Sequence, residues 1–261
     1  MPKSLTAACW SFNPTDSVAE NRDRIAEGVS AAAEAGAQLL LTPECALTGY
    51  PSVARADFAR LDWNELAAAE RELATRARDA GVALVLGTAG TATDGATNDA
   101  LACGNVPAEV RYRKRCLTPL DKKPFVAGDE AVVAECAGWG LGLAICYDIR
   151  FPRVFAELAR AGADAFLVIA HMAGPDPDPG IKETILPAHF ASRAAEWATP
   201  TLLCNASADD RWLNSGCWDA RGIRTADGGE GLLLATLTPR QTLDPWYTTI
   251  RNDSLASFFD G

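Results

Sequence analysis

Cys146 is the residue best placed for covalent chemistry. It ends the apolar run 141–145, and Pro152, a residue favoured at the first position of a helix, follows shortly after it. In α/β proteins reactive side chains lie at the carboxyl ends of strands, and a nearby helix N-terminus favours a thiolate. We therefore expect a nucleophile at Cys146, with the backbone N–H of Tyr147 facing a reacting carbonyl oxygen. A structural cysteine at the end of a buried strand is the alternative.

Glu44 is a carboxylate in an unusual place. It comes two residues after the apolar run 38–41, which reads as a short buried strand. A carboxylate there is costly to desolvate unless it is paired or takes part in chemistry. Within reach of a thiol, it can carry the proton that the thiol gives up. Capping of the next helix is the alternative role.

Lys114 follows the predicted strand 108–113. Strand alternation puts Val110, Tyr112 and Lys114 on one face, so the lysine is expected to point inward with the aromatic ring. An inward ammonium can stabilise a developing oxyanion. A plain charged edge strand is the alternative.

The elements that must hold these residues alternate between strands and helices. We expect strands near 4–12, 38–41, 82–86, 99–103, 108–113, 131–136, 141–146, 165–170, 201–205, 215–219 and 231–237, and helices near 17–36, 63–79, 152–161 and 182–197. This alternation predicts an α/β fold in one domain, residues 1–261. Residues from about 240 to 261 read as a C-terminal tail with Phe258 and Phe259 as an aromatic anchor.

Composition narrows the function classes. The 261 residues are 48% hydrophobic and 22% charged, as in a globular domain, and the net charge of −10 disfavours nucleic-acid partners. No apolar run approaches a membrane span, and the N-terminus lacks a signal-peptide pattern, so a cytoplasmic protein is expected. The eight cysteines show no zinc-ligand spacing, and they indicate free thiols in a reducing compartment. We expect no metal site.

Three segments together resemble the three signatures of the nitrilase superfamily, the carbon–nitrogen hydrolases. The family patterns P-E-x-x-L-T-G-Y, Y-R-K-x-x-L and C-Y-D-x-R-F-P occur in that order, starting at Pro43, Tyr112 and Cys146. The residues 162–164 and 193–196 resemble the family's G-A-D strand start and its R-A-x-E helix. The resemblance runs from about residue 5 to residue 237.

The resemblance implies a fold and a mechanism. The fold is a four-layer α-β-β-α sandwich, and the family usually forms homodimers through helices that match 152–161 and 182–197. Glu44 matches the general base, Lys114 the catalytic lysine and Cys146 the nucleophile. The implied reaction passes through a cysteine thioester and requires no cofactor, metal or other partner than a small-molecule amide.

Substrate class is read from the residue pair after the nucleophile. Nitrilases of the superfamily tend to carry Trp-Glu there, whereas Tyr147-Asp148 is the pattern of the amidase and omega-amidase branch. Arg150 is expected either to bind a substrate carboxylate or to pair with Asp148. The candidate substrate-binding residues are Tyr50, Asp121, Tyr147, Arg150 and Met172. Pocket walls are expected from the loops 50–60, 121–128 and 172–181.

Two positions depart from the family pattern. Many members have a second glutamate that helps hold the substrate, and here the nearest acid is Asp121, one methylene shorter. Either Asp121 replaces it or that role is lost. Arg153 stands where members often have glutamate, which alters a surface or dimer contact.

Other functions remain open at this point. A Cys–His enzyme would use His171, which follows a predicted strand, whereas His189 is expected to pack within its helix. N-carbamoyl amide hydrolysis and nitrile hydrolysis are alternatives within the superfamily. Acyl transfer and a non-catalytic binding role on the same scaffold are the others.

Overall fold

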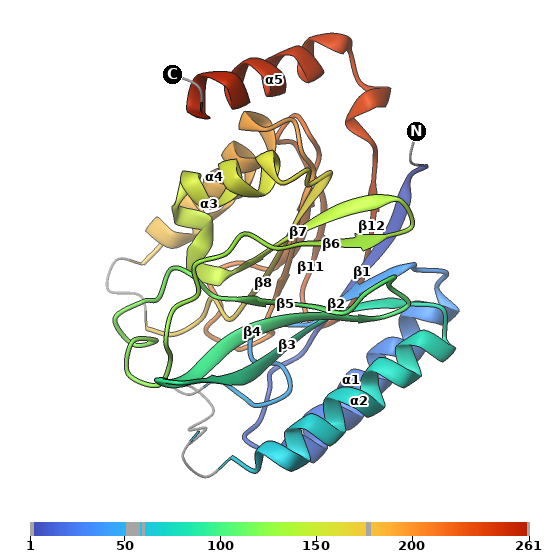
Figure 1. Cartoon of the computed structure of the whole chain (residues 1–261), viewed down its shortest axis with the longest axis vertical. Helices are drawn as coiled ribbons and strands as arrows, with labels where there is room; N and C mark the ends of the chain where they lie inside the picture. Colours follow the sequence, from blue (N-terminus) through green and yellow to red (C-terminus); the bar gives the residue numbers. More distant parts are fainter. Residues whose placement is uncertain (1–2, 51–57, 59–60, 176–178, 260–261) are drawn as a thin grey trace.

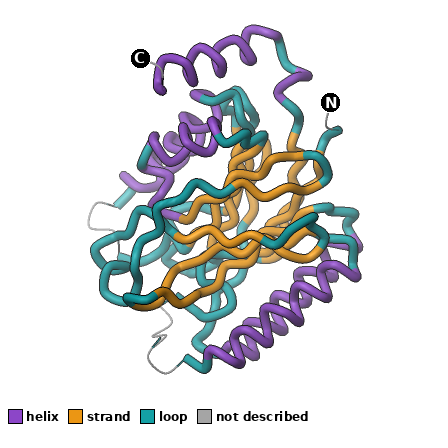
Figure 2. Tube along the Cα trace, in the orientation of Figure 1, coloured by secondary structure: helices purple, strands orange, loops and turns teal. Residues whose placement is uncertain are grey.

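Two six-stranded sheets are stacked face to face, and helices cover the outer face of each (Figures 1 and 2). The computed structural model describes residues 3–50, 58, 61–175 and 179–259. The predicted four-layer α-β-β-α sandwich is confirmed. None of the helices described is long and apolar enough to cross a membrane.

The first sheet has the strand order β12-β1-β2-β3-β4-β5. Its strands are β1 (Leu5–Ser11), β2 (Leu39–Leu41), β3 (Ala83–Ala92), β4 (Gly95–Gly104), β5 (Val110–Arg113) and β12 (Gly231–Leu237). The central strands β1, β2 and β3 run parallel. Helices α1 (Val18–Glu34) and α2 (Trp63–Asp79) cover its outer face (Figure 1).

The second sheet has the order β11-β10-β9-β8-β7-β6. Its strands are β6 (Val133–Cys136), β7 (Trp139–Ile145), β8 (Ala165–Ala170), β9 (Thr201–Asn205), β10 (Ser215–Trp218) and β11 (Arg224–Gly228). Again the central strands, β7, β8 and β9, run parallel. Helices α3 (Pro152–Arg160) and α4 (Ile181–Glu196) cover the outer face.

The apolar core lies in three layers that follow from the strand alternation. Leu39 and Leu41 point between the two sheets, whereas Leu40 points at the helices α1 and α2. Because the central strands are buried on both faces, they read as continuous apolar runs in the sequence. The parallel strands bring their carboxyl ends to one edge of the sandwich, and the segments after β2, β7 and β8 meet there.

Three local features differ from or refine the sequence prediction. The turn between β6 and β7 is only Ala137 and Gly138, both with positive φ. Strand β11 was not predicted, because its sequence Arg-Thr-Ala-Asp-Gly has no apolar alternation and gains its order from pairing with β10. The expected C-terminal tail instead contains a helix, α5 (Pro245–Phe259), which lies beyond α3 and α4 (Figure 1).

Candidate active site

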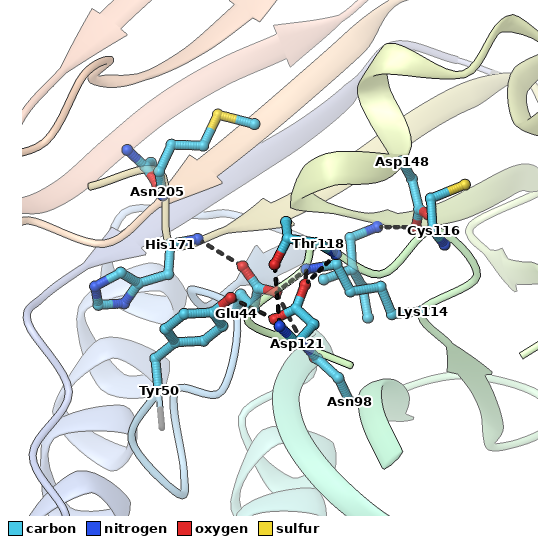
Figure 3. A network of polar contacts seen from close by, with 12 residues as sticks. Glu44, Tyr50, Asn98, Lys114, Cys116, Thr118, Asp121, Asp148, His171 and Asn205 are labelled. Carbon is cyan, nitrogen blue, oxygen red and sulfur yellow. Dashed lines mark hydrogen bonds and ion pairs between the residues drawn. The ribbon is translucent and has the colours of Figure 1, made fainter. Parts of the chain in front are cut away.

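Glu44 lies fully buried in the turn after β2. Its Oε1 accepts hydrogen bonds from Lys114 Nζ at 2.6 Å and from Asn98 Nδ2 at 2.8 Å. Its Oε2 accepts one from the backbone N–H of His171, the first residue after β8, at 2.9 Å. Figure 3 shows these donors converging on the carboxylate from separate elements. The buried negative charge of Glu44 is therefore paired with the Lys114 ammonium and stabilised by hydrogen bonds from protein donors.

The turn that carries Glu44 is held against β3 by close backbone contact. A Cβ on Gly87 would lie 1.8 Å from the carbonyl oxygen of Pro43, so only glycine fits. Gly87 also donates its N–H to Thr42 Oγ1 at 3.0 Å, and its carbonyl accepts from Leu47 N at 2.9 Å. The place of Glu44 at the sheet edge follows from these contacts.

Lys114 directly follows β5 and is completely buried, with Tyr112 buried on the same face as the alternation predicts. Its ammonium lies between two carboxylates, 2.6 Å from Glu44 Oε1 and 2.8 Å from Asp121 Oδ2. Burial alone would lower the pKa of Lys114, but the carboxylate of Glu44 and its other neighbours raise this pKa well above its usual value. The lysine is a permanent cation at neutral pH.

Asp121 faces the lysine rather than open space. Its Oδ2 accepts from Lys114 and from the backbone N–H of Thr118 at 3.0 Å, and its Oδ1 accepts from the Tyr50 hydroxyl. Burial would raise the pKa of the Asp121 carboxyl, but the Lys114 ammonium and the Tyr50 hydrogen bond lower it. Both oxygens of this carboxylate are therefore occupied by protein donors.

Cys146 is the first residue of a short 3₁₀ helix, Cys146–Arg150, that directly follows β7. Its φ is +48°, in the left-handed region, which costs a residue with a Cβ about 1–3 kcal/mol and recurs at functional sites. Burial and then the Glu44 charge raise the pKa of its thiol well above the usual value, while Lys114 opposes this shift. The thiol therefore needs a base before it can attack.

Asp148 holds the turn of Cys146 against the segment of Lys114. Its Oδ2 accepts from Ile145 N at 2.9 Å and from the Tyr112 hydroxyl at 2.7 Å, and its Oδ1 accepts from Cys116 N at 2.8 Å. Among the described residues, the hydrogen-bond donors to the Asp148 carboxylate are thus neutral groups. The expected pairing of Asp148 with Arg150 is not among these bonds. The Asp148 carboxylate therefore links the end of β7, which Cys146 follows, to the segment around β5 that carries Lys114.

These three catalytic candidates thus lie within one network at the edge of the sandwich, and comparison with known proteins fits this arrangement. The carbon–nitrogen hydrolase family model matches residues 6–246. The chain belongs to the carbon–nitrogen hydrolase family.

Solved and curated relatives of this carbon–nitrogen hydrolase include amidases. An amidase from Nesterenkonia sp. matches with a TM-score of 0.77 and 26% identity over 95% of this chain and 97% of that one. A hydrolase encoded in the pqqF 5′ region of Pseudomonas protegens is 34% identical over 64% of this chain and 59% of its own length. An (R)-stereoselective amidase from Pseudomonas sp. is 31% identical over 50% of this chain and 47% of its own length. The chain spans about half to three fifths of these curated relatives.

His171 lies beside the network, but its ring does not join it. The imidazole is 5% exposed, extends away from the Glu44 carboxylate and stacks on the Tyr50 ring with centroids 5.1 Å apart (Figure 3). Neither ring nitrogen has a hydrogen-bond partner among the described residues. Burial lowers the pKa of His171, so the ring is neutral at neutral pH. In this carbon–nitrogen hydrolase, the His171 imidazole therefore makes no hydrogen bond to the described residues around Glu44.

The remaining substrate-binding candidates lie at different depths. Met172 is buried, and its N–H donates to Asn205 Oδ1 at 2.7 Å. Tyr147 is partly exposed and packs edge to face on Phe151. Arg150 is exposed, with its guanidinium carbon 5.8 Å from the Tyr147 ring centroid. Of the expected pocket loops, 51–57, 59–60 and 176–178 lie outside the described residues.

Sequence reasoning missed the polar residues that orient the site. Asn98 and Asn205 lie outside the three signatures, Thr118 directly follows the second one, and Asp148 was assigned only as a possible partner of Arg150. The available signal was weak: Asn98 stands between Thr97 and Asp99 in the first half of its strand, ahead of an apolar second half. Among the residues described, no group of three or more His, Cys, Asp or Glu is arranged to hold a metal ion.

Proposed function

We propose that this carbon–nitrogen hydrolase cleaves a small amide through a Cys146 thioester, releasing a carboxylic acid and ammonia or an amine. The observation that carries the proposal is the buried ammonium of Lys114, 2.6 Å from Glu44, beside the thiol of Cys146. A base, a cation and a nucleophile at one strand edge are the parts that acyl transfer requires.

The first half of the reaction forms the thioester. Glu44 takes the thiol proton, and the sulfur of Cys146 attacks the amide carbonyl carbon. An ammonium has three N–H donors, and two of those on Lys114 face Glu44 and Asp121. The third is available to the tetrahedral oxyanion, together with the Tyr147 N–H. One such donor typically contributes about 10²–10³ in rate.

The thioester forms when the tetrahedral intermediate collapses: the carbon–nitrogen bond breaks as Glu44 returns its proton to the nitrogen, and ammonia or an amine leaves. The second half releases the acid. Glu44 then removes a proton from water, which attacks the thioester, and the proton passes to the departing sulfur. Every proton moves through one carboxylate, and the chemistry needs no redox partner.

Amides are favoured over nitriles by the Tyr147-Asp148 pair and by the solved neighbours. A cysteine variant of the Nesterenkonia amidase was solved in complex with butyramide, and a glutamate variant shows covalent addition of the acetamide moiety of fluoroacetamide at its active-site cysteine. A nitrilase from Pyrococcus abyssi, 33% identical over 59% of this chain, keeps nitriles among the compounds to test.

A screen of ammonia release tests the proposal. Butyramide and other small amides are compared with dicarboxylic monoamides, N-carbamoyl compounds and the matching nitriles. We expect turnover of an amide that the Cys146→Ala variant lacks, and fluoroacetamide should add one acetamide group at Cys146 by mass spectrometry. Turnover that survives Cys146→Ala, or a wild-type enzyme inert to every compound and to the label, would refute it.

We further propose a homodimer in a reducing, cytoplasmic compartment. Apolar side chains are exposed around α3 and α4, with Phe151 39%, Ile181 54% and Ile185 44% exposed. All eight cysteines are unpaired, which suits a reducing compartment. Light scattering should give a dimer for the wild type and a monomer for a double variant with Ile181→Glu and Ile185→Glu. A monomeric wild type would exclude the dimer.

A further inference from the structure

Asn98 forms hydrogen bonds with Glu44 and with Lys114, the two charged residues of the proposed reaction. It lies in β4 and is completely buried. Its side-chain Nδ2 donates to Glu44 Oε1 at 2.8 Å, and its backbone carbonyl accepts from Lys114 N at 2.8 Å. Because an ionised carboxylate only accepts hydrogen bonds, the amide must turn its nitrogen toward Glu44. Its oxygen then has no partner among the described residues.

The two oxygens of Glu44 have different surroundings as a result. Oε1 accepts two side-chain donors, the Lys114 ammonium and the Asn98 amide. Oε2 accepts the backbone N–H of His171. The Cys146 thiol also lies within hydrogen-bond reach of the Glu44 carboxylate. Because Oε1 already accepts from an ammonium and an amide, Oε2 keeps more acceptor capacity for a proton.

We propose that Asn98 is a positioning residue that holds Oε1 of Glu44 so that Oε2 carries every proton of the reaction. The inference rests on the proposed function. Asn98 acts through Glu44 and is not assigned a contact with substrate. Without its amide donor, the carboxylate keeps the Lys114 and His171 donors but is held less tightly, and its ionised form loses a charge-assisted hydrogen bond.

Several other groups face Glu44 and must stay constant in a test. They are Lys114, Asp121, Cys146, Cys45, Tyr50 and His171. A change at Asn98 leaves all six side chains in place. For Asn98→Leu the effect on pH dependence can therefore be assigned to the Glu44 carboxylate itself, whereas Asn98→Asp adds a titratable carboxyl of its own beside Glu44.

The test compares two variants of similar volume with a matched control. Asn98→Leu removes the donor, and Asn98→Asp places an acceptor against Glu44. Thr97→Val changes the neighbouring buried residue, whose side chain lies on the opposite face of β4. The profiles of kcat and kcat/KM against pH are measured on the best amide from the screen, after thermal unfolding has shown that each variant is folded.

We expect Asn98→Leu to lower kcat about 10- to 100-fold with KM within about twofold of wild type, since a hydrogen bond to a charged group is lost and no substrate contact is. In both variants the acidic limb of kcat/KM should move to higher pH, further for Asn98→Asp, because each change disfavours the carboxylate form of Glu44. Thr97→Val should match wild type.

The two proposals fail in different ways. A wild-type enzyme without amide turnover defeats the proposed function, whereas an active wild type with unchanged Asn98 variants defeats only the role of Asn98. A uniform loss at all pH values, or a loss in KM alone, would also overturn it. If Asn98→Leu does not fold, Asn98→Ala, which also removes the donor without adding a titratable group, takes its place.

Discussion

Lys114 shows how single residues of this site depend on one another for their charge. An ammonium with no exposed surface is tolerated because two carboxylates lie within 2.8 Å, and each of them accepts one of its N–H donors. Asp121 therefore forms an ion pair with Lys114, although its side chain is one methylene shorter than the glutamate of many family members. The Tyr50 hydroxyl and the Thr118 N–H hold it against the lysine.

His171 gives a prediction on both activity and acid stability. Burial lowers the pKa of the folded imidazole below its usual 6.5, so the unfolded chain binds a proton that the folded chain does not. The stability contributed by His171 is complete above about pH 6.5 and is lost as the pH falls below it. In His171→Phe this part of the acid sensitivity should disappear, while the backbone N–H still reaches Glu44 and amide turnover persists.

Urea unfolding at pH 5.5 and pH 7.5 measures this effect. His189→Phe is the control for turnover only, because burial, Arg150 and Arg193 lower the pKa of His189 too and its loss should also reduce the acid sensitivity. Loss of turnover in His171→Phe to the level of Cys146→Ala would instead support a Cys–His mechanism.

At the scale of elements, the site depends on how closely β3 approaches the turn after β2. Gly87→Ala would place a methyl group 1.8 Å from the Pro43 carbonyl, and backbone must move to admit it. We expect the Glu44 carboxylate to shift away from Lys114 and kcat/KM to fall at least about 100-fold, since misplacement of about 1 Å is enough for such a loss. Activity assays and thermal unfolding measure the two effects.

Gly229→Ala is the matched control for this change. The nearest atom to a Cβ there is the end of the Arg211 side chain, at 3.4 Å, so a methyl group is admitted without a backbone shift. It should retain wild-type activity. Full activity in Gly87→Ala would show that the turn tolerates displacement and that the close contact does not position Glu44.

At the scale of the whole molecule, α5 is joined to the sandwich through a buried arginine. The Arg251 guanidinium donates to the carbonyls of Ala159 in the last turn of α3, of Ala163 after α3 and of Trp197 after α4, and to Thr199 Oγ1. Carbonyls at helix C-termini lack partners within the helix and carry partial negative charge, so one cation satisfies the ends of both. Arg251 is also the one buried residue among those described in α5.

Arg251→Met should therefore destabilise the fold by about 3 kcal/mol or more, because several buried carbonyls lose their donors. Thermal and urea unfolding measure the loss, and α5 should become accessible to protease before the sandwich does. Asn252→Ala, on the exposed side of the same helix, is the control. Unchanged stability in Arg251→Met would mean that water satisfies these carbonyls as well as the arginine does.

The sequence by itself predicted most of the strands and helices, and its resemblance to the carbon–nitrogen hydrolases predicted the four layers and proposed Glu44, Lys114 and Cys146 as the reactive side chains. Apolar runs, caps and strand ends are local patterns, and the three signatures are short, so both can be read without a structure. Strand β11 and helix α5 could not be read, because their order comes from pairing with β10 and from the contacts of Arg251.

Only the tertiary structure decided which polar groups surround Glu44 and Lys114. Four separate elements supply these groups: Glu44 follows β2, Asn98 lies in β4, Lys114 follows β5 and His171 follows β8. The stacking and register of the two sheets bring them within hydrogen-bond distance. A local pattern carries no information on such register. The roles of Asn98, Asp121 and Asp148 therefore appear only when both sheets are in place, since each side chain bonds to groups from other parts of the chain.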